Sequence, residues 1–309
     1  MARSSRERIK QLIKSIESDN IIFDMDTTEL TSIKAGGKVF CYFIADTIKD
    51  LKKIVEACND NSVDFIMIGD GTNILFNDRH LDLVLIKLGK DFKYIDFSDK
   101  DRISVGAACR LFRMVVSAAD RGYDFSELSG IPGTVGGSVI GNSGTKHKSV
   151  CDFIEKITYL SNESGNVKEK NRILKNGDFD YRNFYLPDLV ILTGVVFKTL
   201  RSGRDDILKK IRSRIKKRKL TQPVNTRNAG CFFKNARSIS ESSGSLIEKC
   251  GMKGFVYGGA RVSSKHANFI ENFNDASSED IFVISNIIKD KVMEKFKVEL
   301  EYEVKTIGF

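Results

Sequence analysis

The chain has 309 residues, of which 41% are hydrophobic and 29% are charged. This composition is typical of a globular protein and excludes a disordered or fibrous one, and the length allows two compact domains. The 50 basic and 41 acidic side chains give a net charge of +9. That charge permits a nucleic acid, an acidic lipid or an anionic small molecule as partner, and it does not choose among them.

Residues 1–20 contain basic side chains but no continuous apolar core of signal-peptide length. Their apolar positions Ile9, Leu12, Ile13 and Ile16 recur at helical spacing, which predicts an N-terminal helix. No later segment approaches the roughly 20 apolar residues that a membrane-spanning helix needs. We therefore expect a cytoplasmic protein that does not insert into a membrane.

The cysteines and histidines exclude some kinds of site. Six cysteines are scattered without a CxxC pair, which indicates reduced thiols that are mostly small buried residues. Three histidines are too dispersed to form a local metal-ligand signature. We expect no metal site.

The first two-thirds of the chain alternate strand-like and helical patterns. Segments rich in β-branched and aromatic residues predict strands at 39–45, 64–68, 83–88, 102–107, 157–161 and 189–200. Amphipathic spacing predicts helices at 48–58 and 109–121. A glycine-rich stretch at 128–144 interrupts this alternation.

A basic segment, Arg201–Lys219, follows the last of these strands. Its residues Ile207, Leu208, Ile211 and Ile215 form one apolar stripe, which predicts a helix with a basic face. Two interpretations of that face remain open. It is either a solvated outer surface, which we favour, or a group that holds phosphates.

The order of elements changes after this helix. Patterns predict helices near 245–250 and 278–296, strands within 255–263 and 268–272, and a terminal strand over 298–306. In the terminal strand Val298, Leu300, Tyr302 and Val304 alternate with charged residues. This mixed order favours an α+β fold over a regular parallel α/β sheet.

Two glycine-rich segments are candidates for ligand binding. The loop Ile68–Asn73 follows a buried strand, and Gly69 and Gly71 allow a tight turn whose N–H groups could hold a pyrophosphate. Alone this signal is weak, because many loops contain glycine. It matches neither the Walker loop nor the GxGxxG fingerprint.

The second segment, Gly130–Gly144, is more specific because it contains six glycines and Pro132. Glycine weakens the interiors of helices and strands alike, so this segment is not expected to form a regular element. A flat ligand lying against bare backbone would compensate for the entropy lost on ordering it. Asn142 offers amide hydrogen bonds at its end.

Three further segments contain polar residues that suit catalysis. Arg182 in DFDYRNF is a planar cation able to bind a carboxylate. Cys231 in TRNAGCFFKN follows a turn of small residues, and Glu303 lies in the terminal strand. Taken singly, each has a mainly structural interpretation as a surface arginine, a buried cysteine and a surface glutamate.

In their order, these motifs resemble the UDP-N-acetylenolpyruvoylglucosamine reductase family. The resemblance runs from about Leu30 to Gly308 and rests on LTSIKAGGKV, GDGTNILFND, ELSGIPGTVGG, DYRNF, TQPVNTRNAGCFFKN, CGMKGFVYGGARVSSKHANFIEN and LEYEVKTIG. The motifs GIPGTVGG and NAGCFFKN are the most specific. Only 49 positions separate Arg182 from Cys231, which resembles the shorter form of the family without a substrate-covering insertion.

The resemblance implies an α+β protein with a two-part FAD-binding region of the vanillyl-alcohol-oxidase type, followed by a smaller α+β substrate domain. We place an N-terminal helix at 1–20, the FAD-binding domain at 21–200 and the substrate domain at 201–309. The resemblance also implies that NADPH reduces a non-covalently bound FAD, and that the reduced flavin then passes hydride to UDP-N-acetylglucosamine enolpyruvate. The product would be UDP-N-acetylmuramate, a peptidoglycan precursor, and both substrates would use one cleft in turn.

The family's functional residues transfer to this chain by motif. Arg182 would stabilise the enolate-like carboxylate, Cys231 would donate the proton, and Glu303 would orient the substrate carboxyl region, with Glu301 as the alternative to Glu303. The implied cofactor-binding residues are Gly69, Asp70, Gly71, Thr72, Asn73, Gly130, Ile131, Pro132, Gly136, Gly137, Ser138, Asn142, Gly144 and Arg218. The implied substrate-binding residues are Gln222, Lys234, Asn235, His266 and Asn268.

The main departure from the family pattern is Cys231, which stands where the family commonly has serine. A thiol is a stronger acid than a hydroxyl, with an unperturbed pKa of about 8.5, so it can still donate a proton. It also makes the site sensitive to oxidation and alkylation. A smaller departure is GNSGTKH, where the family usually continues with alanine, tyrosine and glycine.

Three other functions remain as alternatives. Another FAD-dependent oxidoreductase, acting on a sugar or hydroxy acid, would keep both glycine segments but has no reason to keep NAGCFFKN. A nucleic-acid-binding protein would use the net charge, although no nucleic-acid motif is present. A catalytically inactive flavin-binding module would explain only the replacement of serine by Cys231. The sequence leaves the oligomeric state open.

Overall fold

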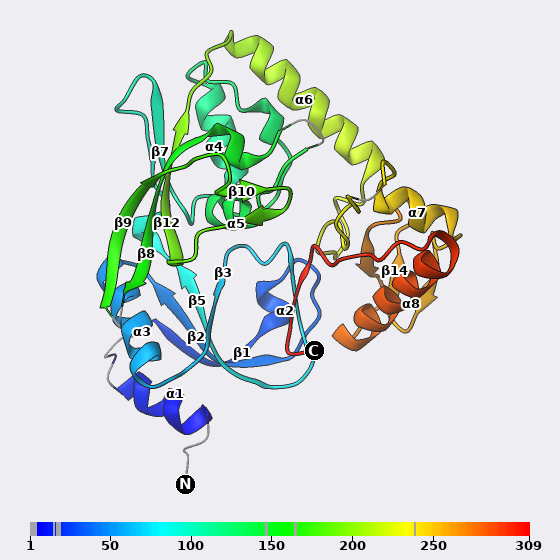
Figure 1. Ribbon diagram of the computed structural model, residues 1–309, viewed down its shortest axis with the longest axis horizontal. Helices are drawn as coiled ribbons and strands as arrows, with labels where there is room; N and C mark the ends of the chain where they lie inside the picture. The colour runs from blue at the N-terminus through cyan, green and yellow to red at the C-terminus, as the bar shows by residue number, and fades with distance from the viewer. Residues whose placement is uncertain (1–4, 15, 17–19, 146–147, 164–165, 238) are drawn as a thin grey trace. The chain divides into compact units, whose positions relative to one another are not determined.

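The computed structural model describes residues 5–14, 16, 20–145, 148–163, 166–237 and 239–309. The chain divides into two compact units (Figure 1). Unit 1 comprises residues 1–24, 40–70 and 82–216, and unit 2 comprises residues 25–39, 71–81 and 217–309. The sequence placed the main boundary at residue 200. In the structure it lies at residue 216, and two short early segments also belong to unit 2.

A four-stranded sheet forms one part of unit 1. Its order is β1 (Ile21–Asp26), β2 (Lys38–Ala45), β5 (Leu81–Leu88) and β3 (Phe65–Ile68), and β3 pairs with β5 in parallel. Helix α3 (Ile48–Asp60) begins at a capping box formed by Thr47 and Asp50 and buries its apolar face in the same core. The N-terminal helix α1 (Ser5–Lys14) packs Ile9 and Leu12 fully into this core.

A five-stranded antiparallel sheet forms the other part of unit 1. Its order is β6 (Ile95–Asp96), β7 (Arg102–Gly106), β12 (Leu189–Lys198), β8 (Ile154–Glu163) and β9 (Asn166–Ile173). Helices α4 (Leu111–Ala119) and α5 (Val135–Ile140) contribute to its core. The short strands β10 (Phe179–Asp180) and β11 (Asn183–Phe184) form a separate hairpin. Three single turns of 3-10 helix, at Lys90–Phe92, Ser126–Leu128 and Val150–Phe153, connect these elements.

Unit 2 has its own core. Helices α7 (Ser243–Lys249) and α8 (Ser278–Phe296) pack with the three-stranded sheet β13 (Val256–Tyr257), β14 (Ala260–Val262) and β15 (Ile270–Asn272). The short helix α2 (Thr27–Leu30) also lies in unit 2. Strand β4 (Ile74–Phe76) pairs in parallel with the last strand, β16 (Lys305–Ile307), so early and late parts of the chain meet within this unit.

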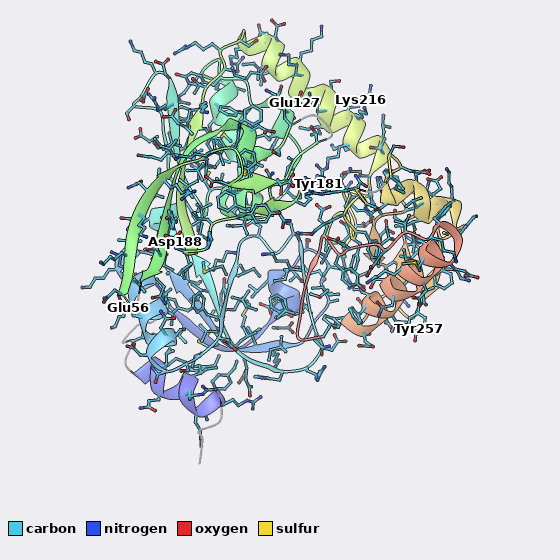
Figure 2. All side chains as sticks on the ribbon, viewed as in Figure 1. Glu56, Glu127, Tyr181, Asp188, Lys216 and Tyr257 are labelled. Atoms are coloured by element: carbon cyan, nitrogen blue, oxygen red, sulfur yellow. The ribbon has the colours of Figure 1, made fainter. Side chains whose placement is uncertain are left out.

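The basic segment forms helix α6 (Arg204–Thr221), which buries Ile207 and Ile211. Three of its cations form ion pairs with earlier residues of unit 1: Arg204 lies 3.1 Å from the carboxylate of Asp120, Lys210 lies 2.7 Å from that of Asp124, and Arg214 pairs with Glu127, which is labelled in Figure 2. The burial of the apolar stripe explains the helix, and the ion pairs show that part of its basic face is used within the protein. In the described residues no helix is long and apolar enough to cross a membrane.

The α+β fold predicted from the sequence is confirmed, and the predicted strands and helices of the first two-thirds are present. Two predictions of local structure are wrong. In the terminal segment, residues Val298–Glu301 are alternately buried and exposed, as expected of a strand. The regular strand, however, covers only Lys305–Ile307. The glycine-rich stretch contains the regular helix α5, because Thr134 caps it and tertiary packing outweighs the low helix propensity of glycine.

Candidate functional site

The loop that follows β3 exposes backbone donors. In the described part of the chain, the N–H groups of Gly69, Asp70, Gly71 and Thr72 donate no hydrogen bond. Gly71 has a φ of +63°, and a Cβ at this position would lie 2.0 Å from the carbonyl oxygen of Leu30. Only glycine fits such a position without displacing backbone. The loop is therefore held in a conformation that leaves consecutive N–H groups available to an anion.

The first half of the glycine-rich stretch, residues 130–134, shows the same property. Gly130 and Gly133 have φ values of +81° and +102°. The N–H groups of Gly130, Gly133 and Thr134 donate no hydrogen bond among the described residues. Within unit 1 this half lies beside the loop after β3, since a Cβ on Gly69 would be 2.6 Å from Thr134 Oγ1. The two segments thus bring open amides together.

The second half, residues 135–144, uses its amides internally as far as Ser143. Val135 N–H donates to the carbonyl of Cys109, Gly136 N–H donates to that of Ala107, and Gly137 N–H donates to Thr134 Oγ1. A Cβ on Gly136 would lie 3.0 Å from the Cβ of Ala107, so glycine here permits close packing. These amides support the fold, and they are not free to hold a ligand.

These observations fit a dinucleotide cofactor. A pyrophosphate needs several convergent N–H donors and close approach to the backbone, and both are present at Gly69, Asp70, Gly130, Gly133 and Thr134. Asn142 contributes differently from the prediction. It is buried, its amide nitrogen donates to the carbonyl of Asp180 and its amide oxygen accepts from Cys151 N–H, so it anchors the end of the stretch.

Arg182 lies beside the end of this stretch within unit 1. Its two terminal guanidinium nitrogens donate to the carbonyl oxygens of Asn142 and Gly144, at 3.1 and 3.2 Å. The guanidinium also lies 5.0 Å from the ring centre of Tyr181, which Figure 2 labels. Arg182 has a φ of +56°, an unusual value for a residue with a side chain, so the surrounding structure must hold it there.

Cys231 and Glu303 are brought together by pairing within unit 2. The segments 231–234 and 301–304 run antiparallel, with Phe233 opposite Tyr302. Lys234 N–H donates to the carbonyl of Glu301 at 2.8 Å, and Glu303 N–H donates to the carbonyl of Phe232 at 2.9 Å. The thiol-bearing and carboxylate-bearing segments are therefore neighbours.

The pairing is irregular at Glu303. The carbonyl of Phe232 accepts from the N–H groups of both Glu303 and Val304, so two residues of one segment oppose one of the other, as in a β-bulge. The carbonyl of Glu303 accepts from the amide of Asn73 at 3.0 Å. Both backbone groups of Glu303 are thus fixed.

The two candidate glutamates differ in environment. The side chain of Glu301 is 74% exposed and lies 3.4 Å from Lys234 Nζ, whereas Glu303 is half-buried. Glu301 takes part in the regular pairing around Tyr302, whereas the bulge begins at Glu303. This difference favours Glu303.

Asn268 occupies a different place from the one expected of a substrate ligand. Its side chain is 4% exposed, its amide oxygen accepts from Phe233 N–H, and its amide nitrogen donates to the carbonyl of Phe233. Its backbone carbonyl accepts from Phe232 N–H. We therefore assign it to holding the Cys231 segment. The neighbouring His266 accepts the N–H of Asn268 at Nδ1, and burial lowers its pKa, which keeps the ring neutral near pH 7.

Arg218 lies near Cys231 in unit 2. Burial lowers the pKa of its guanidinium, and its charge interacts with Cys231. Cys231 and Cys250 are half-buried, whereas the other four cysteines are buried, and burial raises the pKa of Cys41, Cys58 and Cys151 to about 12. Cys231 thus differs from the structural thiols.

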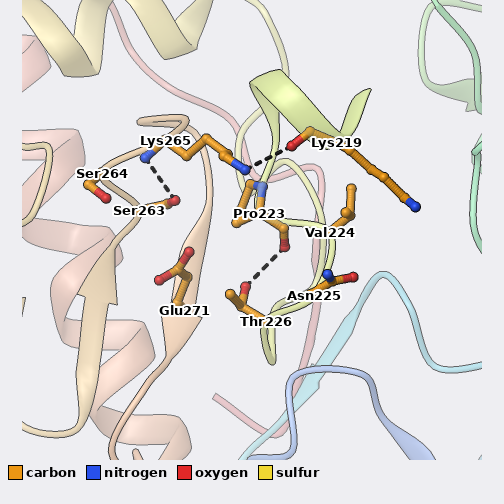
Figure 3. Close-up of a pocket in the computed structure, with 9 residues that line it drawn as sticks. All are labelled: Lys219, Pro223, Val224, Asn225, Thr226, Ser263, Ser264, Lys265 and Glu271. Atoms are coloured by element: carbon orange, nitrogen blue, oxygen red, sulfur yellow. Dashed lines mark hydrogen bonds between the residues drawn. The ribbon is translucent and has the colours of Figure 1, made fainter. Parts of the chain in front are cut away.

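A polar cavity of about 290 Å³ lies in unit 2, next to the segment that leads to Cys231 (Figure 3). Lys265 Nζ donates to the carbonyl of Lys219 across its rim, and Ser263 Oγ accepts from Lys265 N–H. Glu271 is 4% exposed and pairs with Arg261 at 2.7 Å. The lining residues are Lys219, Pro223, Val224, Asn225, Thr226, Ser263, Ser264, Lys265 and Glu271.

Sequence reasoning missed this cavity. Of its neighbours it identified Arg218, Gln222 and His266, which adjoin the lining residues in the chain. The sequence feature that could have indicated it is the presence of two polar loops, TQPVNT and SSKH, which contain the predicted site residues Gln222 and His266. Of the other predicted substrate ligands, Asn235 is exposed and its side-chain oxygen accepts from Ser243 N–H. Lys234 lies beside Glu301.

Comparison with known proteins identifies both units. Residues 40–170 match a sequence model described as FAD binding domain. Residues 222–307 match the model of the C-terminal domain of UDP-N-acetylenolpyruvoylglucosamine reductase. The first match contains both glycine-rich segments, and the second contains Cys231, Glu303 and all the residues that line the polar cavity except Lys219.

Relatives match over almost the whole chain. The UDP-N-acetylenolpyruvoylglucosamine reductase of Rickettsia typhi is 34% identical, over 92% of this chain and 95% of its own length. The one from the Wolbachia of Brugia malayi is 31% identical, over 91% of this chain and 93% of its own. The chain belongs to the UDP-N-acetylenolpyruvoylglucosamine reductase family.

A solved structure agrees with this assignment. The crystal structure of the family member from Thermus caldophilus superimposes with a TM-score of 0.77, covers 93% of this chain and 98% of that chain, and shares 28% sequence identity. The family resemblance, the fold class and the use of FAD inferred from the sequence are confirmed. The chain is an FAD-dependent oxidoreductase of this family.

Proposed function

We propose that this chain uses NADPH and bound FAD to reduce UDP-N-acetylglucosamine enolpyruvate to UDP-N-acetylmuramate in peptidoglycan synthesis. The observation that carries the proposal is the paired arrangement of the Cys231 and Glu303 segments in a unit that matches the family's C-terminal domain. We further propose that the enzyme is cytoplasmic, where its substrates would be available, and that it serves cell-wall biogenesis, cell shape and cell division.

FAD would be held through its pyrophosphate by the open amides of the loop after β3 and of residues 130–134. When bound, it supplies hydride transfer between NADPH and the enolpyruvyl group. The protein must then stabilise the negative charge that develops on the substrate's carboxylate side and deliver a proton. We assign charge stabilisation to Arg182, because a fixed guanidinium aimed at developing charge needs little reorganisation.

Cys231 would deliver the proton from its thiol, and Glu303 would orient the substrate's carboxyl region. The rigid backbone around both residues supports these roles, since proton transfer requires a donor within hydrogen-bonding reach of the accepting carbon. The side chains around the polar cavity, together with Gln222, Lys234, Asn235 and His266, would bind the nucleotide-linked part of the substrate.

The test separates the two half-reactions in anaerobic stopped-flow experiments. NADPH should bleach the flavin, and UDP-N-acetylglucosamine enolpyruvate should restore its colour. In Cys231→Ala we expect bleaching at the normal rate and recovery slowed by about 10²–10⁴-fold, because only the proton donor is lost. Cys231→Ser should recover at a measurable rate and no longer lose activity after alkylation.

Two results would reject this function. One is a purified protein that binds no FAD, and the other is a reduced flavin that the enolpyruvate does not reoxidise. Reoxidation driven instead by a sugar or hydroxy acid acting on the flavin would indicate another oxidoreductase. Normal recovery in Cys231→Ala would show that Cys231 is not the proton donor. The proposed reaction itself would stand.

A further inference from the structure

Tyr302 lies between the two glutamates of the terminal segment and faces the interior of unit 2. It is half-buried, and its ring lies directly opposite Phe233 in the paired segments. Sequence reasoning treated it only as one apolar position in an alternating strand. Its contacts connect three parts of unit 2.

The phenol of Tyr302 is anchored to helix α8. Its oxygen lies 3.0 Å from Ser285 Oγ and donates to Asn286 Oδ1 at 2.8 Å. Burial raises the pKa of the phenol, so the donor proton is retained across the physiological range. Lys289 Nζ lies 4.9 Å from the ring centre. One end of the side chain is therefore fixed to a helix of the core.

The ring of Tyr302 contacts the residues that follow Cys231. It is stacked on Phe233, with ring centres 5.5 Å apart and planes inclined by 23°, and it meets Phe232 edge-on at 5.8 Å. Aromatic pairs of this kind contribute about 0.5–1.5 kcal/mol beyond the area they bury. Phe232 and Phe233 are almost completely buried, so their positions depend on this ring.

The backbone on both sides of Tyr302 carries the pairing. Glu301 accepts from Lys234 N–H on one side, and Glu303 donates to the carbonyl of Phe232 on the other. A shift of the ring would therefore move the segment of the acid and the segment of the carboxylate relative to each other. No other described side chain stacks on Phe233 while it also hydrogen-bonds to α8.

We propose that Tyr302 is a positioning residue for proton transfer, which holds the Cys231 segment and the Glu303 segment in register by joining Phe232 and Phe233 to helix α8. This inference rests on the proposed function, because it assigns the acid to Cys231. Tyr302 itself does not touch the reacting atoms in this role.

The test compares Tyr302→Leu, which removes the ring, with Tyr302→Phe, which keeps the stack and loses only the phenol hydrogen bonds. In the holoenzyme we expect Tyr302→Leu to slow flavin reoxidation by the enolpyruvate about 10–100-fold, since small misplacements of catalytic groups have effects of this size. Reduction of the flavin by NADPH should stay within about twofold, and the KM for the enolpyruvate should change little. Tyr302→Phe should recover most of the lost rate, because its ring would keep both the stack on Phe233 and the contacts with Phe282 and Lys289 of α8.

A second readout does not depend on turnover. The rate at which iodoacetamide alkylates Cys231 in the substrate-free holoenzyme should change in Tyr302→Leu and stay near the wild-type rate in Tyr302→Phe. Tyr123→Phe is the matched control, because it also removes a phenol hydrogen bond, to the carbonyl of Lys100 in unit 1. It should alter neither half-reaction nor the alkylation of Cys231.

The outcomes are distinguishable. Normal reoxidation and normal alkylation in Tyr302→Leu would overturn the proposal. An equal loss in both half-reactions would also overturn it, because that pattern indicates a general folding defect. If Tyr302→Leu does not fold, Tyr302→Met removes the ring instead, and a normal reoxidation rate together with unchanged alkylation in that variant would count against the proposal. A wild-type enzyme that the enolpyruvate does not reoxidise would reject the proposed function, while the alkylation rates would still test Tyr302.

Discussion

The two halves of the glycine-rich stretch use glycine for different reasons. In residues 130–134 the backbone takes positive φ values at Gly130 and Gly133, and the N–H groups of Gly130, Gly133 and Thr134 stay open. In residues 135–144 the N–H groups as far as Ser143 are bonded within the fold, and Gly136 permits contact with Ala107. A count of glycines does not separate these uses. The hydrogen bonds of the amides do, and they support our proposal that the first half binds the cofactor.

The sharpest test of this difference replaces Gly133 with alanine. Its φ of +102° lies in a region that residues with a Cβ rarely adopt, so the substitution should cost about 1–3 kcal/mol in strain. Because relief of that strain would turn the open amides away from the pyrophosphate, we expect FAD affinity to fall by about tenfold or more. Fluorescence titration of the apoprotein with FAD measures this loss.

Gly141→Ala is the matched control in the second half. A Cβ there would meet its nearest neighbour, the carbonyl oxygen of Gly137, at 3.4 Å, which is ordinary contact. Stability to urea should change by no more than about 0.5 kcal/mol, and FAD affinity should be retained. Equal losses of FAD affinity in both variants would abolish the distinction between the halves.

Removal of the flavin should distinguish the two halves through the hydrogen exchange of single amides. In the apoprotein, the N–H groups of Gly130, Gly133 and Thr134 should exchange with solvent about tenfold faster or more than in the holoenzyme, because their only partner has gone. Those of Val135 and Gly136 should change less, since their acceptors belong to the protein. Hydrogen exchange followed by NMR would measure both sets, and uniform deprotection of the stretch would contradict the assignment.

The smallest expected effect concerns the residue at the junction of the halves. Thr134 Oγ1 accepts from Gly137 N–H at 3.2 Å and caps α5. Thr134→Ala should lower the free energy of unfolding by about 1 kcal/mol, as for other N-caps, with FAD affinity close to wild type. Thr134→Ser supplies the same acceptor and serves as the control. A larger effect on flavin binding than on stability would mean that the Thr134 side chain contacts the cofactor.

Local patterns predicted much of the fold because local forces determine it. Helix α3 begins at Ile48 as expected, since its capping box and apolar stripe both lie within a few residues. The strands of unit 1 are similarly marked by β-branched residues. Ordered motifs also identified the candidate site residues, although each one alone had a mainly structural interpretation.

The missed features depend on contacts between distant parts of the chain. Helix α5 forms in a glycine-rich segment because Ala107 and Cys109 accept its first N–H groups. Asn268 resembles a substrate ligand in sequence, and only the structure shows that the backbone of Phe233 occupies its amide. The bulge that distinguishes Glu303 from Glu301 arises at the carbonyl of Phe232, which no pattern in the terminal segment reveals.

The parallel pair β4 and β16 has a consequence for synthesis on the ribosome. Ile74 emerges more than 200 residues before its partner Lys305. Strand β4 therefore stays unpaired while those residues are made, and the other early residues of unit 2, at 25–39 and 71–81, also wait for the later part of their unit. Unit 2 cannot complete its fold until β16 has emerged, and the open edge of β4 is available for wrong pairing during that interval.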